Sequence, residues 1–287
     1  MPSFLITDPA CFDVCYQINP WMRPKAWTAQ SLVAAKAASG RLKAALQAAG
    51  AHVETVEAVR GLPDLVFPAN AAVVLDSRVL LARFLHPERQ GEEAVFRSAF
   101  LSLKKRGLIQ EIVDLPHGVI QEGAGDAIWD IGRKLFWVGY GQRSSKSSVA
   151  AIHQTFGQEV VPLELASDRF YHLDTCFCPL AGGEVLYYPP AFTPAALAAI
   201  RARVPKAQRI EASDEEAAAF CVNAVNLDGK VIMARAPASL RKTLRARGYS
   251  LTEIDLDPFI LSGGGAYCMT LRLDRTSGSH ASVLAAE

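Results

Sequence analysis

A cysteine near the end of the chain lies where a nucleophile would be useful. Cys268 follows a glycine-rich segment, 261–267, and precedes an apolar run that predicts a strand. Glycine lets the backbone approach a ligand closely, and the N–H groups of such a turn are available to a reaction intermediate. A thiolate presented there could attack a carbon electrophile. A buried, unreactive cysteine is the alternative, and this segment alone does not exclude it.

A nucleophilic cysteine needs a group that moves protons, and segment 171–175 supplies one. His172 and Asp174 are two residues apart, so in an extended segment both side chains project to the same face. Imidazole exchanges protons near neutral pH, and a neighbouring carboxylate orients the ring or receives a substrate cation. Cys176 and Cys178 continue this spacing. Because no second such pair follows, we interpret them as packing thiols and predict no metal site.

Polar residues also precede two other predicted strands. Glu122 and Asp126 bracket flexible backbone, and Asn70 occupies the corresponding place before the strand that starts at residue 71. Taken singly, the two acids would be solvated turn residues. One polar segment at the head of each unit, all on one side of a ring, is the arrangement that a central active site requires. The sequence therefore predicts a site assembled from several separate turns.

The elements that would position these residues recur along the chain. Each unit consists of an apolar strand, a short turn, a second strand and an amphipathic helix, followed in the clearest units by a third strand. The fifth unit is assembled from both termini, with 268–273 joining 4–7 ahead of a helix over 30–49 and a strand over 52–57. The predicted unit starts, spaced by about 50 residues as in propellers, are 71, 127, 175, 222 and 269.

This pattern predicts an α/β fold, namely a five-bladed α/β propeller closed by the N- and C-terminal segments, with an open α/β sheet as the alternative. The helices expected in the other four units span 91–105, 145–156, 193–203 and 236–247. We expect a single catalytic domain over residues 1–275. The Ser/Ala/Gly-rich segment 276–287 predicts a flexible C-terminal tail.

Composition narrows the class of partner. Half of the 287 residues are hydrophobic, enough for a large buried core, and the formal net charge of +1 excludes a strong overall field. No Lys/Arg cluster is interleaved with aromatic residues, so we expect a small-molecule partner and no nucleic acid. Apolar runs stay shorter than the roughly 18 residues of a membrane span, and the first strand reaches Asp8 too early for a signal peptide. We therefore expect no membrane partner, a cytoplasmic location and reduced cysteines.

The ordered motifs resemble the pentein superfamily of guanidino-group-modifying enzymes, which includes arginine deiminases, dimethylarginine dimethylaminohydrolases and amidinotransferases. Within it, the chain most resembles bacterial arginine dihydrolases. The matching motifs lie between residues 11 and 274 and are Phe12-Asp13, Ile18 to Met22, Ala69-Asn70-Ala71, Arg83 to His86, Glu88 to Glu92, Glu122 to Asp126, Phe170 to Leu180 and Cys268-Met269-Thr270.

The resemblance implies the five-bladed pentein fold and a covalent mechanism. Cys268 would attack the central guanidinium carbon, and His172 would protonate the departing amine and later activate water against an S-alkylthiouronium intermediate. Glu122 and Asp174 match acidic positions of the family, one orienting His172 and both available to the guanidinium. Asp126 belongs to the same acidic group.

Other matched positions concern substrate binding. Arg89 and Arg143 resemble the arginines that hold the substrate carboxylate, a task that suits the bidentate guanidinium fork. Asn19 matches a substrate-contacting position of the arginine dihydrolases. The resemblance implies no cofactor and no metal, and a substrate that is arginine, citrulline or a methylated arginine. It leaves the oligomeric state open, a homo-oligomer included.

Asn70 is an informative departure, because deiminases and dimethylarginine hydrolases carry an aspartate there. An amide supplies no charge, but it donates to a ureido oxygen as readily as it accepts from a guanidinium N–H. This dual capacity favours a dihydrolase that accepts both arginine and the citrulline made from it. Ala124, inserted between two glycines, also occurs in the dihydrolase-like branch.

Several alternatives remain open from the sequence. Dimethylarginine dimethylaminohydrolase, arginine deiminase and citrulline hydrolase share the nucleophile and differ in substrate. An amidinotransferase would pass the amidine to an amine, and only product analysis separates it. From a different class, the chain would be an arginine-binding propeller without activity, although the intact set of Cys268, His172 and Glu122 argues against this.

Overall fold

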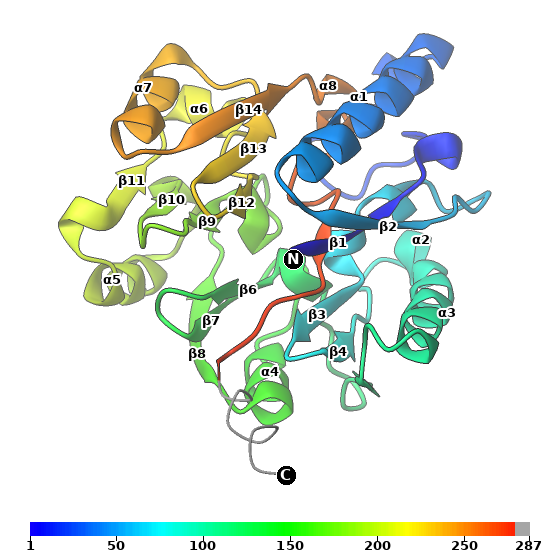
Figure 1. Cartoon of the computed structure of the whole chain (residues 1–287), viewed down its shortest axis with the longest axis horizontal. Coiled ribbons are helices and arrows are strands. Elements are labelled where there is room, and N and C mark those ends of the chain that lie inside the picture. The colour runs from blue at the N-terminus through cyan, green and yellow to red at the C-terminus, as the bar shows by residue number, and fades with distance from the viewer. Residues whose placement is uncertain (279–287) are drawn as a thin grey trace.

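The computed structural model describes residues 1–278 and contains five three-stranded sheets. The same supersecondary unit builds each sheet. Two strands joined by a tight turn pair antiparallel, and a helix then leads to a third strand parallel to the second. A parallel pair needs such a crossover because both of its strands run in the same direction. Figure 1 shows the five sheets arranged around a common centre, with the long helices on the outside.

The first unit contains β3 (Ala72–Leu75), β4 (Arg78–Leu81), α2 (Pro87–Gln90), α3 (Glu92–Lys105) and β5 (Glu111–Val113). The second contains β6 (Ala127–Asp130), β7 (Leu135–Tyr140), α4 (Ser148–Phe156) and β8 (Glu159–Glu164). The third contains β9 (Phe177–Pro179), β10 (Val185–Tyr187), α5 (Pro194–Arg203) and β11 (Arg209–Glu211). The fourth contains α6 (Asp214–Ala218), β12 (Val225–Leu227), β13 (Lys230–Ala234), α7 (Ala238–Ala246), β14 (Ser250–Ile254) and α8 (Asp257–Ile260).

The fifth unit joins the two ends of the chain, as the sequence predicts. Its elements are β15 (Leu271–Arg272), β1 (Ser3–Thr7), α1 (Ala29–Ala48) and β2 (His52–Val56). In the antiparallel pair of β1 with β15, Phe4 lies opposite Arg272. Figure 1 shows the N-terminal strand beside the C-terminal segment near the centre of the ring. The five-bladed fold and its closure by both termini are confirmed.

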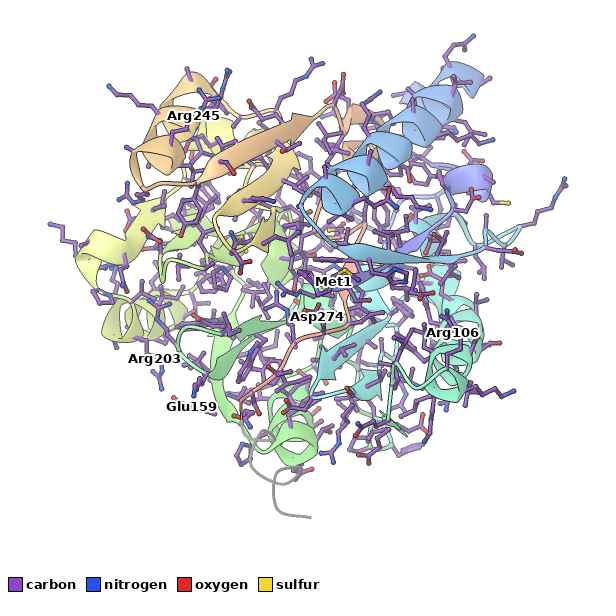
Figure 2. All side chains as sticks on the ribbon, viewed as in Figure 1. Met1, Arg106, Glu159, Arg203, Arg245 and Asp274 are labelled. Carbon is purple, nitrogen blue, oxygen red and sulfur yellow. The ribbon has the colours of Figure 1, made fainter. Side chains whose placement is uncertain are left out.

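Side-chain packing closes the ring. Within residues 1–278, no strand pairing joins one sheet to the next. Five hydrophobic clusters instead fill the spaces between neighbouring sheets: Val73 of the first unit packs in one cluster with Trp129 of the second, and Leu5 of the fifth packs in another with Val74 of the first. Burial of apolar surface drives this packing. Figure 2 shows Arg106, Arg203 and Arg245 at the periphery of the ring.

Two local predictions differ from the structure. The predicted strand 268–273 is confined to β15, because backbone bonds such as Met269 N–H to Gly265 O keep the preceding residues in a turn. Segment 173–175, expected to be extended, is a 3-10 turn closed by Thr175 N–H to the His172 carbonyl. Both turns lie at the heads of units, where the chain enters a sheet.

The predicted tail is described only up to residue 278. Within it, Ser277 donates its backbone N–H to Asp76 Oδ1 at 2.8 Å. The remaining residues, 279–287, lie outside the described part of the chain, so the flexible tail stays a prediction. A search of residues 1–278 finds no helix with the length and apolar character needed to cross a membrane.

Candidate active site

Short turns at the heads of the units meet near the centre of the ring. The turn η4 (Pro68–Asn70) contacts η5 (Gly123–Gly125), which in turn contacts η6 (Leu173–Thr175). Each precedes the first strand of its sheet, so three separate segments deliver polar residues to one place. This arrangement is the one expected from the sequence, in which the turns at the heads of several units meet.

His172 lies at the middle of the first group of residues. Its Nε2 is 2.7 Å from Glu122 Oε2, and its Nδ1 is 3.4 Å from Asn70 Nδ2. Asn70 also donates Nδ2–H to the Glu122 carbonyl at 3.3 Å and accepts from Arg89 through Oδ1 at 2.8 Å. Both ring nitrogens of His172 therefore have partners, Glu122 at Nε2 and the Asn70 amide at Nδ1.

Glu122 is held as a carboxylate. Burial alone would raise its pKa, but the hydrogen bond and charge of His172 and the charge of Arg143 hold that pKa well below the usual range. Arg143 donates to Glu122 Oε2 at 3.2 Å and to the Ile18 carbonyl at 2.9 Å, and its guanidinium lies over the Tyr171 ring. The hydrogen bond to Glu122 fixes the orientation of the His172 ring, which a general acid needs.

Cys268 and Asp174 form the second group. The Cys268 thiol donates to Asp174 Oδ2 at 3.2 Å, and the buried Oδ1 of Asp174 has no hydrogen-bond partner. Burial raises the pKa of Asp174 to about 7, and burial together with the Asp174 charge raises the pKa of Cys268 well above its ordinary value. A cation placed against Oδ1 would lower both pKa values and so favour the thiolate.

Gly125 connects the two groups. A Cβ on this residue would lie 2.3 Å from Asn70 Nδ2 and 3.6 Å from Asp174 Oδ2. Both groups therefore lie against the same glycine and belong to one site. The Cys268, His172 and Asp174 side chains are all buried.

Asp126 and Asn19, two further predicted substrate-binding residues, make hydrogen bonds of their own. Asp126 accepts the Leu173 N–H and the Ser144 hydroxyl, and burial raises the pKa of Asp126 to about 6. Asn19 accepts the backbone N–H groups of residues 21 and 22 and donates to the Ser262 carbonyl. Asn19 thus ties its own loop to the segment that leads to Cys268.

Arg89 has less freedom than the resemblance implies. Arg89 lies in α2 and Glu92 lies in α3. The Arg89 Nε and one terminal nitrogen donate to the two carboxylate oxygens of Glu92, at 2.9 and 2.8 Å. Its other terminal nitrogen donates to Asn70. The bidentate edge that would hold a substrate carboxylate is therefore paired with Glu92, and Arg89 contacts the site through Asn70.

The structure also adds residues that sequence reasoning missed. Asn223, at the head of the fourth unit, donates to Cys268 Sγ at 3.1 Å. Asp64 is a buried acid that accepts the hydroxyls of Tyr16 and Ser262. The place of Asn223 before β12 matches that of Asn70 before β3, so the rule of one polar residue per unit head would have found it.

Cys176 and Cys178 lie outside these contacts. Their thiols donate to backbone carbonyls, Cys176 to that of Leu173 and Cys178 to that of Ala224. Burial raises the pKa of both thiols, to about 12 for Cys178, so neither supplies a thiolate near neutral pH. In residues 1–278 no group of three or more His, Cys, Asp or Glu side chains is arranged to hold a metal ion.

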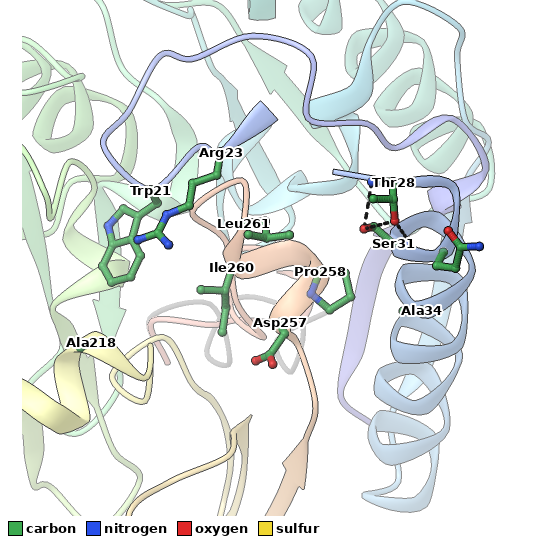
Figure 3. A pocket seen from close by; sticks show the side chains of 11 residues that line it. Trp21, Arg23, Thr28, Ser31, Ala34, Ala218, Asp257, Pro258, Ile260 and Leu261 are labelled. Carbon is green, nitrogen blue, oxygen red and sulfur yellow. Dashed lines mark hydrogen bonds between the residues drawn. The ribbon is translucent and has the colours of Figure 1, made fainter. Parts of the chain in front are cut away.

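A separate pocket of about 580 Å³ lies between the segment around Trp21, the start of helix α1 and helix α8 (Figure 3). Trp21, Arg23, Asp257 and Leu261 are among its lining residues. It is joined to the site through Trp21, whose backbone N–H donates to Asn19 Oδ1. None of the buried residues described above lines it, so its size alone does not make it the reaction site.

Comparison with known proteins places the chain among enzymes of guanidino compounds. The family model described as "N,N dimethylarginine dimethylhydrolase, eukaryotic" matches residues 25–275. The chain is 40% identical over 272 residues to the bifunctional arginine dihydrolase/ornithine cyclodeaminase ArgZ of Synechocystis sp., covering 94% of this chain but 37% of ArgZ. The N(G),N(G)-dimethylarginine dimethylaminohydrolase of Mycobacterium tuberculosis is 34% identical over 270 residues, covering 94% of this chain and 85% of that protein.

Solved structures agree with these matches. A crystal structure of the N-terminal domain of ArgZ bound to substrate superposes with a TM-score of 0.91 at 39% identity, covering 96% of this chain and 100% of that one. Together these similarities show that the chain belongs to the pentein superfamily of guanidino-group-modifying enzymes, in its branch of dimethylarginine dimethylaminohydrolases and arginine dihydrolases.

Proposed function

We propose that this chain is a cysteine-dependent arginine dihydrolase that converts arginine and two waters into ornithine, carbon dioxide and two ammonias. The identity with ArgZ supports this substrate, although this chain spans only 37% of that relative. In the proposal Cys268, His172 and Glu122 are catalytic. The residues that bind or surround the substrate are Asn19, Asn70, Arg89, Asp126, Arg143 and Asp174.

The first hydrolysis begins when the guanidinium pairs with Asp174. This carboxylate has an unpartnered buried oxygen, and a cation there favours transfer of the Cys268 proton to His172. The thiolate adds to the guanidinium carbon, and the carbon–nitrogen bond to the departing group breaks. His172, held by Glu122, gives that group a proton, so ammonia leaves and an S-alkylthiouronium remains.

Water completes this half. His172 removes a proton from water, the resulting hydroxide adds to the thiouronium carbon, and the carbon–sulfur bond breaks to release citrulline and regenerate the thiolate. One imidazole therefore acts in two protonation states, and the hydrogen bond to Glu122 holds its ring in place.

The main support for a second hydrolysis is the identity and position of Asn70. Its neutral amide is buried in contact with His172, where deiminases carry an aspartate. An amide N–H donates to the ureido oxygen of citrulline, whereas a carboxylate would repel it. The thiolate then adds to the ureido carbon, a second ammonia leaves, and water releases a carbamate of ornithine that breaks down to ornithine and carbon dioxide.

The proposed reaction takes place on a small molecule and needs a reduced nucleophile. All six cysteines are free thiols, which agrees with the cytoplasmic location that we propose. The mechanism uses side chains only and calls for no cofactor.

Hydrolysis of methylated arginines is the second candidate, because the matching family model and the mycobacterial relative carry that description. The same thiolate would then release methylamine or dimethylamine and stop at citrulline. Asn70 favours the dihydrolase, because a reaction that ends at citrulline gains nothing from a donor to the ureido oxygen.

A substrate panel separates these candidates. The purified chain is incubated with arginine, citrulline, monomethylarginine and asymmetric dimethylarginine, and ammonia, methylamines, citrulline and ornithine are quantified. The proposal predicts ornithine and ammonia from both arginine and citrulline. Dimethylamine as the main product, with arginine unreacted, would support the second candidate and overturn the first.

A further inference from the structure

Asn223 lies where the fourth unit meets the nucleophile, and the mechanism above does not use it. The side chain is fully buried. Its Oδ1 accepts the backbone N–H groups of Tyr267 at 3.0 Å and of Cys268 at 3.2 Å. One side-chain oxygen thus holds two successive peptide groups, which fixes the turn that carries the thiol.

The amide nitrogen of Asn223 makes a second pair of contacts. Nδ2 donates to Cys268 Sγ and to the Asp174 carbonyl, each at 3.1 Å. An amide NH2 has two hydrogens, so this arrangement uses both. The bond to sulfur strengthens when the thiol loses its proton, because the acceptor then carries a charge. The bond to the carbonyl fixes the direction of that donor.

The surroundings of Asn223 are shaped to allow these contacts. A Cβ on Gly265 would lie 2.8 Å from Asn223 Oδ1, so glycine leaves room for the amide. Asp174 contacts the same sulfur and has the opposite effect: burial and the Asp174 charge raise the pKa of Cys268, whereas the hydrogen bond from Asn223 lowers it. Asn223 therefore supplies a donor to a sulfur that also faces a carboxylate.

We propose that Asn223 is a thiolate-positioning residue, which stabilises and aims the Cys268 sulfur through Nδ2 and holds the attacking turn through Oδ1. The guanidino carbon as the target of the thiolate rests on the proposed function. The stabilisation of the thiolate does not depend on which substrate is bound.

Two substitutions separate the two halves of this role. Asn223→Asp keeps an acceptor for the two N–H groups but replaces the donor to sulfur with an oxygen. Asn223→Ala removes both. Asn226→Asp is the matched control, because Asn226 lies three residues further along in the same unit and its amide donates to the carbonyls of Asp228 and Lys230. If the alanine variant fails to fold, the aspartate variant carries the test.

The first measurement is the pH dependence of Cys268 alkylation by iodoacetamide, followed for its peptide by mass spectrometry. Loss of one hydrogen bond to a charged acceptor should slow alkylation about tenfold to a hundredfold at fixed pH and move the midpoint up by about one pH unit or more. The control should match the wild type. An unchanged midpoint in Asn223→Asp would overturn the proposal, even if the variant melts at a lower temperature.

The second measurement is turnover of arginine. A thiolate-positioning role predicts that kcat falls about tenfold or more while KM changes little, since Asn223 contacts sulfur rather than a substrate subsite. A raised KM with normal kcat would contradict it. If the wild-type chain does not consume arginine, the proposed function fails, and the alkylation profile still decides the role of Asn223.

Discussion

Cys268 Sγ lies 3.2 Å from Oδ2 of Asp174, whose other oxygen, Oδ1, is buried without a hydrogen-bond partner. The thiol of the nucleophile therefore donates its proton in a hydrogen bond to this carboxyl. A guanidinium is a cation suited to pair with Oδ1, because it donates several N–H groups in one plane. This relationship links substrate binding to formation of the thiolate.

Asp174→Asn should raise stability at alkaline pH while removing activity. Burial raises the folded-state pKa of Asp174 to about 7, above the ordinary value of about 3.9, so the folded protein binds this proton more tightly than the unfolded chain does. The resulting stability is fully present below about pH 4 and is lost as the pH rises through about 7. We expect the variant to exceed the wild type by about 1 kcal/mol or more at pH 8, measured by urea unfolding. Equal differences at pH 5 and pH 8 would show that Asp174 does not titrate in this way.

His172→Ala should stall both halves of the reaction, because the same imidazole protonates the leaving group and deprotonates water. The wild-type pH profile of kcat should be bell-shaped, and the variant should lose several orders of magnitude. His153→Ala is the control, since His153 lies on the surface helix α4 and binds the Gln158 carbonyl. Intact-protein mass spectrometry provides the check: a covalent adduct that accumulates at the normal rate in His172→Ala would assign the acid to another group.

Gly125→Ala should lower the activity of the enzyme with little change in fold. The new methyl group would lie 2.3 Å from Asn70 Nδ2, so Asn70 must move away from His172. We expect kcat/KM to fall at least about tenfold, the effect of losing one hydrogen bond in a buried site. Gly40→Ala is the control, because a Cβ there meets nothing within 4 Å and alanine favours helix α1. Steady-state kinetics of both variants would decide, and normal activity of Gly125→Ala would contradict the assigned place of Asn70.

Asn70→Asp should shift the product of arginine from ornithine toward citrulline. The aspartate would still accept from Arg89, but it would turn an anion toward the citrulline oxygen in place of a donor. A lost hydrogen bond that leaves a group unpaired costs about 1–3 kcal/mol, or about tenfold to more than a hundredfold in rate. The check is the ratio of ornithine to citrulline from labelled arginine. An unchanged ratio would remove Asn70 from the explanation of the second hydrolysis.

The fold was predictable from sequence because the repeated strand, turn and helix pattern is local and strongly apolar. The third strands of the third and fourth units, β11 and β14, were not predicted. Strand β11 is short, and exposed residues alternate with less exposed ones along β14. The ring is closed by packing between neighbouring sheets. These contacts join residues of different units, so the spacing of residues along the sequence does not predict them.

The site was predictable only in part. Cys268, His172 and Glu122 stood out through their motifs, but the extended geometry expected for His172 and Asp174 was wrong, since Asp174 lies within a 3-10 turn that begins directly after His172. Asn223 was missed because apolar neighbours made its segment resemble the interior of a strand. Only the ring brings it against a sulfur 45 residues away in sequence.

The most direct test of the central claim follows the guanidino carbon of arginine labelled with ¹³C. For the wild type, NMR should show the label leaving as carbon dioxide or bicarbonate in step with ornithine, with citrulline as an intermediate. Cys268→Ser should keep at most about a hundredth of this turnover, since removing a nucleophile costs several orders of magnitude in rate. Cys178→Ser, a buried thiol bonded to the Ala224 carbonyl, should turn over normally. Label that stops in citrulline with the wild type, or a Cys268→Ser variant that still releases it at an appreciable rate, would contradict the dihydrolase mechanism.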